Sequence, residues 1–202
     1  MVLEVLDKFI DTIMIALKGK KLAVLGARGT GKSTLLHFLH NNELLIESRQ
    51  TTLAKPVAEN RFRLGDLQLD LKDTKDLPGG ELAIRQWEKL HNESDYVIYL
   101  INASEPNSDG IVYDLKEVSE WQNKLENKPK LLIVVTHMDL NSEYCKLSDS
   151  DVGTFYDEYV KNMGSFLHPL SNDVNVCIGA LNNHENACSL ISDIIQELHN
   201  EL

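Results

Sequence analysis

The sequence predicts an α/β domain in which helices cover both faces of a mostly parallel sheet. Three observations support this prediction. Short apolar segments alternate with longer amphipathic segments along most of the 202 residues, as parallel strands joined by helices do. A glycine-rich turn lies between the first apolar segment and the helix expected after it. No internal repeat or low-complexity linker interrupts the alternation, so we expect one domain over residues 21–202, preceded by a separate segment 1–20.

Residues 2–18 are predicted to form an amphipathic helix ahead of the domain. Apolar side chains recur at helical spacing, and Glu4, Asp7 and Asp11 fall on the opposite stripe. Gly19 is expected to end the helix, because glycine is a common C-terminal stop. An acidic stripe is repelled by anionic lipid. We therefore expect this helix to bind a protein partner or to pack against its own chain, without insertion into a membrane.

The other elements follow in order along the chain. Strands are expected at 22–25, 61–64, 67–73, 96–101, 131–135 and 174–178, and helices at 33–40, 82–92, 111–125, 151–167 and 187–202. The strand segments are short and mostly apolar, whereas the helical segments carry apolar residues along one stripe. Gly65 and Asp66 form a turn between two strand segments and predict one antiparallel pair at the edge of the sheet.

The composition restricts the class of function. A formal net charge of −11 repels phosphate backbones, and no dense basic run offsets it, so we expect no nucleic-acid ligand. The three cysteines, at positions 145, 177 and 188, lack metal-binding spacing and predict reduced thiols. No apolar run approaches the roughly 20 residues of a membrane span, and the N-terminus lacks a signal-peptide layout. These features predict a cytoplasmic protein.

The glycine-rich turn carries the strongest functional signal. Residues 26–33 read GARGTGKS and fit the phosphate-loop pattern G-x-x-x-x-G-K-[ST] at every fixed position. Backbone N–H groups of such a turn face the phosphates of a nucleotide, together with the N-terminus of the following helix. Lys32 is expected at the β and γ phosphates, and Ser33 on Mg²⁺. The predicted phosphate-binding residues are Gly29, Thr30, Gly31, Lys32, Ser33 and Thr34.

Four further segments follow this loop: 49–52 (RQTT), 76–79 (DLPG), 136–139 (THMD) and 179–181 (GAL). With the loop, they resemble the five ordered signatures of the Ras-like and Arf-like small GTPases over residues 21–202. The resemblance implies a three-layer α-β-α P-loop NTPase fold of the G-domain type. It also implies GTP and GDP as ligands and Mg²⁺ as the cofactor.

The resemblance implies a magnesium site built from three segments. Ser33 and the switch threonine Thr52 would contact the metal, and Asp76 would hold it through water, while the Gly79 N–H would sense the γ-phosphate. Two alternatives stay open. Thr51 is adjacent to Thr52, and Asp73 shares strand parity with the inner residues of 67–73. Asp76 is preferred because only this aspartate has a glycine three residues on.

The last two segments resemble the base-reading signatures. Asp139 would accept hydrogen bonds from guanine N1–H and N2–H₂, which adenine cannot offer. His137 replaces the usual lysine and could stack on the base, and Thr136 replaces the usual asparagine. The Ala180 N–H would meet guanine O6, with Leu181 completing that segment.

The expected hydrolysis is slow. Ras-like and Arf-like proteins place a water-orienting glutamine directly after D-x-x-G, but Gly80 stands there in this chain. The expected catalytic groups are Lys32, Arg28 in the phosphate loop, and Arg49, which resembles the built-in arginine of heterotrimeric G-protein alpha subunits.

The sequence therefore predicts a GTP-binding molecular switch with slow hydrolysis. A protein effector or partner chain would bind through the N-terminal helix and the switch loops. One alternative is a nucleotide-binding interaction module that does not cycle, and a second is a P-loop ATPase.

Overall fold

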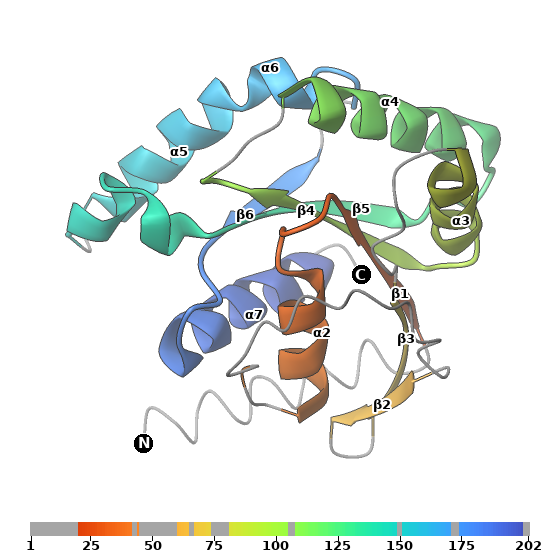
Figure 1. Cartoon of the computed structure of the whole chain (residues 1–202), viewed down its shortest axis with the longest axis horizontal. Helices are drawn as coiled ribbons and strands as arrows, with labels where there is room; N and C mark the ends of the chain where they lie inside the picture. The colour runs from red at the N-terminus through yellow and green to blue at the C-terminus, as the bar shows by residue number, and fades with distance from the viewer. Residues whose placement is uncertain are drawn as a thin grey trace.

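Figure 1 shows the computed structural model of the chain, an open sheet with helices on both faces. The structure describes residues 20–41, 44, 60–64, 67–73, 81–104, 108–148, 151–170 and 174–199. Four predicted features lie outside these residues: the helix at 2–18, the switch segment 49–52, the turn at 65–66 and the segment 76–79.

In the described part of the chain the sheet has six strands in the order β2-β3-β1-β4-β5-β6. They are β1 (Lys21–Gly26), β2 (Asn60–Leu64), β3 (Leu67–Asp73), β4 (Tyr96–Asn102), β5 (Lys130–Thr136) and β6 (Asn175–Ile178). Neighbouring strands are parallel except for β2 and β3, which pair antiparallel. The predicted mostly parallel sheet with one antiparallel edge pair is confirmed.

The helices also follow the predicted order. They are α2 (Lys32–Asn41), α3 (Glu81–Asn92), α4 (Ser108–Lys124), α5 (Val152–Asn162), α6 (Gly164–Leu167) and α7 (His184–His199). None of the helices among the described residues has the length and apolar character needed to span a membrane.

Two helix boundaries differ from the prediction. The single helix expected at 151–167 is divided at Met163, where the backbone ψ is −10° and the Phe166 N–H bonds the Met163 carbonyl at 2.8 Å. Gly164 follows directly, and glycine is a poor helix former. The last helix begins at His184 because the Asn183 side chain accepts the Asn186 N–H at 2.9 Å, as an N-cap does.

Two apolar layers enclose the central strands. On one face α2 and α7 pack over side chains that include Leu22, Val24, Ile98, Leu100 and Val134. On the other face α4 packs over Ala23, Leu25, Val97, Tyr99 and Val135. Alternate residues of one strand thus enter opposite layers, and Figure 1 shows helices above and below the sheet. Burial on both faces explains why β1, β4 and β5 read as continuous apolar runs.

This arrangement brings the loops after β1, β4, β5 and β6 to one edge of the sheet. The four strands are mutually parallel, so their carboxyl ends point the same way. In an open α/β sheet, ligands bind outside this edge.

His91 is a fully buried polar residue in the last turn of α3, where it contacts α4. Its ring packs against Trp121 with the ring centroids 5.6 Å apart. The Nδ1–H group donates to the Asn92 side-chain oxygen at 2.9 Å, and Nε2 has no hydrogen-bond partner. Burial lowers the pKa of His91, although the Asn92 bond and the nearby Glu88 carboxylate act in the opposite direction. The folded protein therefore favours the neutral ring.

Replacement of His91 by phenylalanine should reduce the loss of stability in acid. The folded-state pKa lies below the unfolded value of about 6.5, so the unfolded state binds more protons as the pH falls below that value. Each unit of lowered pKa corresponds to about 1.4 kcal/mol of unfolding free energy lost at low pH. Urea unfolding of wild type and His91→Phe between pH 7.5 and 5 measures the difference. The exposed His168 provides the control variant His168→Phe, and an identical pH slope in all three proteins would contradict the assignment.

Candidate nucleotide-binding site

The loop between β1 and α2 has the backbone conformation of a phosphate loop. Gly26, Gly29 and Gly31 have φ angles of 136°, 78° and 87°, which side-chain-bearing residues rarely adopt. At Gly26 the space is also restricted, because an added Cβ would lie 2.6 Å from the Leu100 carbonyl oxygen. Two of these glycines are the fixed glycines of the sequence motif. Steric restriction therefore explains why glycine occupies these motif positions.

Polar side chains close the loop from inside. The Lys32 ammonium donates to the carbonyls of Gly26 at 2.9 Å and Ala27 at 2.7 Å, and the residue is only 6% exposed. The Thr30 hydroxyl also donates to the Ala27 carbonyl, at 2.9 Å. The loop thus curves around a positive charge, where the phosphates of a nucleotide are expected.

The first turn of α2 adds backbone donors and two side-chain hydroxyls to this loop. Helix α2 begins at Lys32, so its first N–H groups and the positive end of its dipole face the loop. Ser33 is exposed and Thr34 is half-buried. A hydroxyl oxygen is the kind of hard ligand that Mg²⁺ prefers, so the exposed Ser33 suits the predicted role.

The other predicted magnesium ligands, Thr52 and Asp76, lie outside the described residues, as do Gly79 and Arg49. The alternative Asp73 is the last residue of β3, and its backbone is in register with Val24 of β1. Asp73 therefore stands near the loop edge of the sheet. Within the described residues no group of three His, Cys, Asp or Glu side chains is arranged to hold a metal.

Thr136 joins the phosphate loop to the end of β5. It is 1% exposed, and its hydroxyl lies 2.9 Å from the Thr30 carbonyl, 3.2 Å from the Ile101 carbonyl and 2.8 Å from His137 Nδ1. Carbonyl oxygens only accept, so the hydroxyl proton goes to a carbonyl and His137 Nδ1–H donates to the hydroxyl oxygen. Despite its short side chain, Thr136 contacts the phosphate loop, β4 and His137.

His137 turns the chain back over the phosphate loop. Its φ of 62° makes it the one non-glycine residue with positive φ among the described residues. A Cβ built on Gly31 would lie 3.9 Å from His137 Cε1 and 3.4 Å from Leu181 Cδ1. The segments after β5 and β6 therefore meet at the phosphate loop.

Backbone hydrogen bonds connect the two predicted base-reading segments. The Met138 N–H donates to the Gly179 carbonyl at 3.1 Å, and the Gly179 N–H donates to the Val135 carbonyl at 2.9 Å. Asp139 is half-buried in a short 3-10 helix, η1 (Met138–Leu140), while Ala180 is buried. The Asp139 carboxylate and the Ala180 N–H therefore belong to adjacent segments.

Two residues near these segments were not predicted. Asn102, at the end of β4, donates from Nδ2 to the Gly29 carbonyl at 3.3 Å. The Cys145 thiol lies 3.1 Å from the Asp139 carbonyl. A polar residue directly after an apolar strand was a signal for Asn102, because Thr136 occupies the same place after β5. No sequence signal marked Cys145. Arg28, by contrast, is an exposed member of the loop itself.

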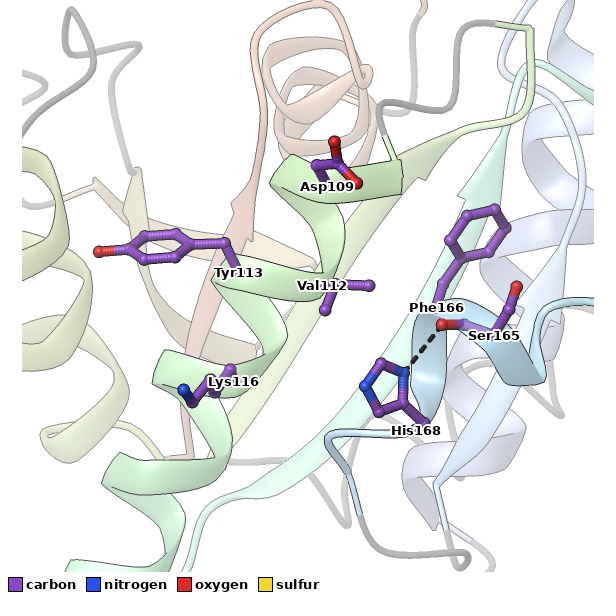
Figure 2. A pocket seen from close by; sticks show the side chains of 7 residues that line it. All are labelled: Asp109, Val112, Tyr113, Lys116, Ser165, Phe166 and His168. Atoms are coloured by element: carbon purple, nitrogen blue, oxygen red, sulfur yellow. Dashed lines mark hydrogen bonds between the residues drawn. The ribbon is translucent and has the colours of Figure 1, made fainter.

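A separate groove of about 530 Å³ lies between α4 and α6. Figure 2 shows its lining residues, with the His168 Nδ1–H donating to the Ser165 carbonyl at 2.9 Å. The groove is lined by Asp109, Val112, Tyr113, Lys116, Ser165, Phe166 and His168. None of these residues belongs to the predicted nucleotide site.

The phosphate loop and the paired segments after β5 and β6 define a P-loop nucleotide-binding domain of the G-domain class. The family described as 50S ribosome-binding GTPase matches residues 21–137, more than half of the chain. The chain belongs to this GTPase family.

Bacterial relatives at low identity carry the same kind of domain. The tRNA modification GTPase MnmE of Hamiltonella defensa is 23% identical over 145 residues, which are 68% of this chain and 31% of that protein. The enzyme of the same name from Bartonella tribocorum is 25% identical over 190 residues, which are 91% of this chain and 41% of that protein. The chain thus spans between about three and four tenths of the length of these relatives.

Solved structures share the fold. The small COPII coat GTPase Sar1 of Encephalitozoon cuniculi, in complex with GDP, has a TM-score of 0.53 at 14% identity, covering 98% of this chain and 90% of that one. The elongation factor SelB of Methanococcus maripaludis, in complex with a GTP analogue, has a TM-score of 0.53 at 14% identity. The match covers 91% of this chain and 34% of that one. At such identity the likeness establishes the fold alone.

Removal of the Thr136 hydroxyl should loosen the phosphate loop. Thr136→Val keeps the shape of the side chain but leaves the buried Thr30 carbonyl without this donor, at a cost of about 1–3 kcal/mol in unfolding free energy. Nucleotide affinity should fall as well. Thr136→Ser keeps the hydroxyl and should therefore retain most of the stability and most of the nucleotide affinity. Urea unfolding and calorimetric nucleotide titration measure the two effects. The exposed Thr154 provides the control Thr154→Val, and a Thr136→Val protein indistinguishable from it would refute the role of this bond.

Proposed function

We propose that this chain binds GTP and GDP with Mg²⁺ and hydrolyses GTP slowly, acting as a conformational switch. The bond from Thr136 to the Thr30 carbonyl is the observation that supports it most. It holds the segment that would read a base against the loop that would bind phosphates. A ligand with both a base and a polyphosphate would therefore contact both parts at once.

Guanine is the proposed base because of the groups beside the loop. Asp139 offers a carboxylate acceptor to guanine N1–H and N2–H₂, and the Ala180 N–H offers a donor to O6. Adenine presents neither pattern, so an ATPase is the less favoured reading. His137 and Leu181 flank Gly31 and would contact the base from the side of the loop.

Magnesium is the proposed cofactor, with Ser33, Thr52 and Asp76 as its protein partners. When bound, the metal would neutralise charge on the β and γ phosphates. The exposure of Ser33 supports its part in the site. The position of Asp73 at the end of β3 keeps it as the alternative to Asp76. Gly79 would sense the γ-phosphate and so link hydrolysis to the switch.

The proposed hydrolysis is slow because the residue after the D-x-x-G segment is Gly80, which cannot orient a water molecule through a side chain. Lys32 would stabilise charge on the γ-phosphate from inside the loop. Arg28 is exposed on the same loop and Arg49 precedes Thr52, so either guanidinium would add positive charge to the transition state.

The absence of a glutamine after Gly79 also supports a second function, an interaction module that binds nucleotide without cycling. In either case we propose a protein partner, which would contact the segment 2–18 and the switch segments. This chain covers only 31% and 41% of the length of the two relatives named as tRNA modification GTPases. With a net charge of −11, we do not propose nucleic acid as a ligand of this domain.

Replacement of Asp139 by asparagine should change the base preference. The amide donates where the carboxylate accepted, so GTP affinity should fall by about 1.5–3 kcal/mol for each charged hydrogen bond lost, and xanthosine triphosphate should bind better. Competition of GTP, ATP and xanthosine triphosphate against a fluorescent nucleotide measures this. The exposed Asp157 supplies the control Asp157→Asn. An unchanged preference for GTP over ATP in Asp139→Asn would show that another segment reads the base.

Removal of an arginine that acts in hydrolysis should slow a single turnover of GTP. A transition-state arginine contributes about 10³–10⁵ in rate in related systems, so either Arg28→Ala or Arg49→Ala should lose most of the hydrolysis while GTP binding persists. Rapid-mix assays with enzyme in excess measure the rate, and Arg85→Ala, at an exposed position of α3, is the control. If wild type binds GTP but does not hydrolyse it, the non-cycling module is the better description.

A further inference from the structure

Asn102 and Thr136 occupy equivalent places at the ends of two paired strands. They are register partners in the parallel pair β4–β5. Asn102 Nδ2 donates to the Gly29 carbonyl at 3.3 Å, and the Thr136 hydroxyl donates to the Thr30 carbonyl at 2.9 Å. Two adjacent strand ends thus restrain two consecutive carbonyls of the phosphate loop.

The orientation of the Asn102 amide follows from the donors around it. Its Oδ1 accepts the Ser104 N–H at 2.9 Å and the Ser104 hydroxyl at 2.8 Å. A backbone N–H can only donate, so the amide atom facing it must be the oxygen. The NH₂ group therefore faces Gly29. One side chain connects the phosphate loop to the chain that follows β4.

The restraint of a carbonyl also aims the N–H of the same peptide unit. In a trans peptide the C=O and the following N–H point in opposite directions. With the Gly29 and Thr30 carbonyls held toward the strand ends, the N–H groups of Thr30 and Gly31 face away from them. Within the described residues neither of these N–H groups donates to a protein acceptor. Successive N–H groups that share one direction form an anion site.

We propose that Asn102 is a positioning residue for phosphate binding, which holds the Gly29 carbonyl so that the Thr30 N–H faces the phosphates of the bound nucleotide. This inference rests on one part of the proposed function, namely that the chain binds a nucleoside di- or triphosphate. The hydrogen bonds of the Asn102 side chain go to Gly29 and Ser104, neither of which is assigned to the base. Its contribution therefore concerns the phosphates and is independent of the base, unlike that of Asp139.

The test compares variants that separate the two ends of the Asn102 amide. Asn102→Asp keeps the oxygen that accepts from Ser104, but it replaces the donor to Gly29 with an oxygen that repels the carbonyl. Asn102→Ala removes both contacts. Ser104→Ala removes only the hydroxyl and leaves the Gly29 bond in place. Asn123→Asp makes the same chemical change at an exposed position of α4 and controls for the added charge.

Calorimetric titration of each variant of the 202-residue chain with Mg²⁺–GDP and Mg²⁺–ADP gives the readout. We expect Asn102→Asp to weaken both nucleotides by the same factor, about tenfold or more, and Asn102→Ala by about 3- to 10-fold, the range of one hydrogen bond. The ratio of GDP to ADP affinity should stay at the wild-type value. The nucleotide affinities of Ser104→Ala and Asn123→Asp should stay within about twofold of wild type, because neither change removes the hydrogen bond to the Gly29 carbonyl.

Three outcomes would overturn the proposal. They are wild-type GDP affinity in Asn102→Asp, a changed ratio of GDP to ADP affinity, and failure of both Asn102 variants to fold in thermal unfolding. The last would make Asn102 a residue required for folding and not a positioning residue. If wild type prefers ADP to GDP, the proposed guanine specificity fails, while the loss in Asn102→Asp relative to wild type still tests the inference.

Discussion

The hydrogen bond from the buried Thr136 hydroxyl to the Thr30 carbonyl is the contact on which the rest of the site depends. It spans 106 residues of sequence and joins the loop after β1 to the end of β5. The same hydroxyl accepts from His137, so the position of that ring follows from the position of the loop. Because Thr136 is 1% exposed, water does not compete for this bond, and its loss would leave polar groups unpaired.

That bond forms only because the sheet places the strand ends side by side. β1, β4 and β5 are parallel neighbours, and helices on both faces bury their side chains. Such burial disfavours a shift in register, since a slip by one residue would exchange the two faces. Gly26 adds a second constraint, because its approach to the Leu100 carbonyl excludes any side chain. The position of the loop is therefore a consequence of core packing.

The residues predicted for the site differ in how the rest of the domain holds them. Lys32, Thr30 and the glycines belong to a loop closed by its own hydrogen bonds and by the strand ends. Asp139 and Ala180 belong to segments held together through the Met138 and Gly179 backbones. Arg28, by contrast, is an exposed residue of the same loop. The residues proposed for phosphate binding and base recognition thus belong to segments that hydrogen bonds connect to the strand ends.

The sequence by itself determined the order and type of the elements and the phosphate-loop motif, because these follow from local periodicity and from the glycine and lysine spacing. It also indicated that the segments 136–139 and 179–181 each follow an apolar strand segment. Only the tertiary structure decided that Thr136 bonds Thr30, that Asn102 bonds Gly29 across 73 residues, and that His137 lies beside Gly31. Such contacts depend on strand register and on φ angles at single residues. Neither leaves a periodic signal in the sequence.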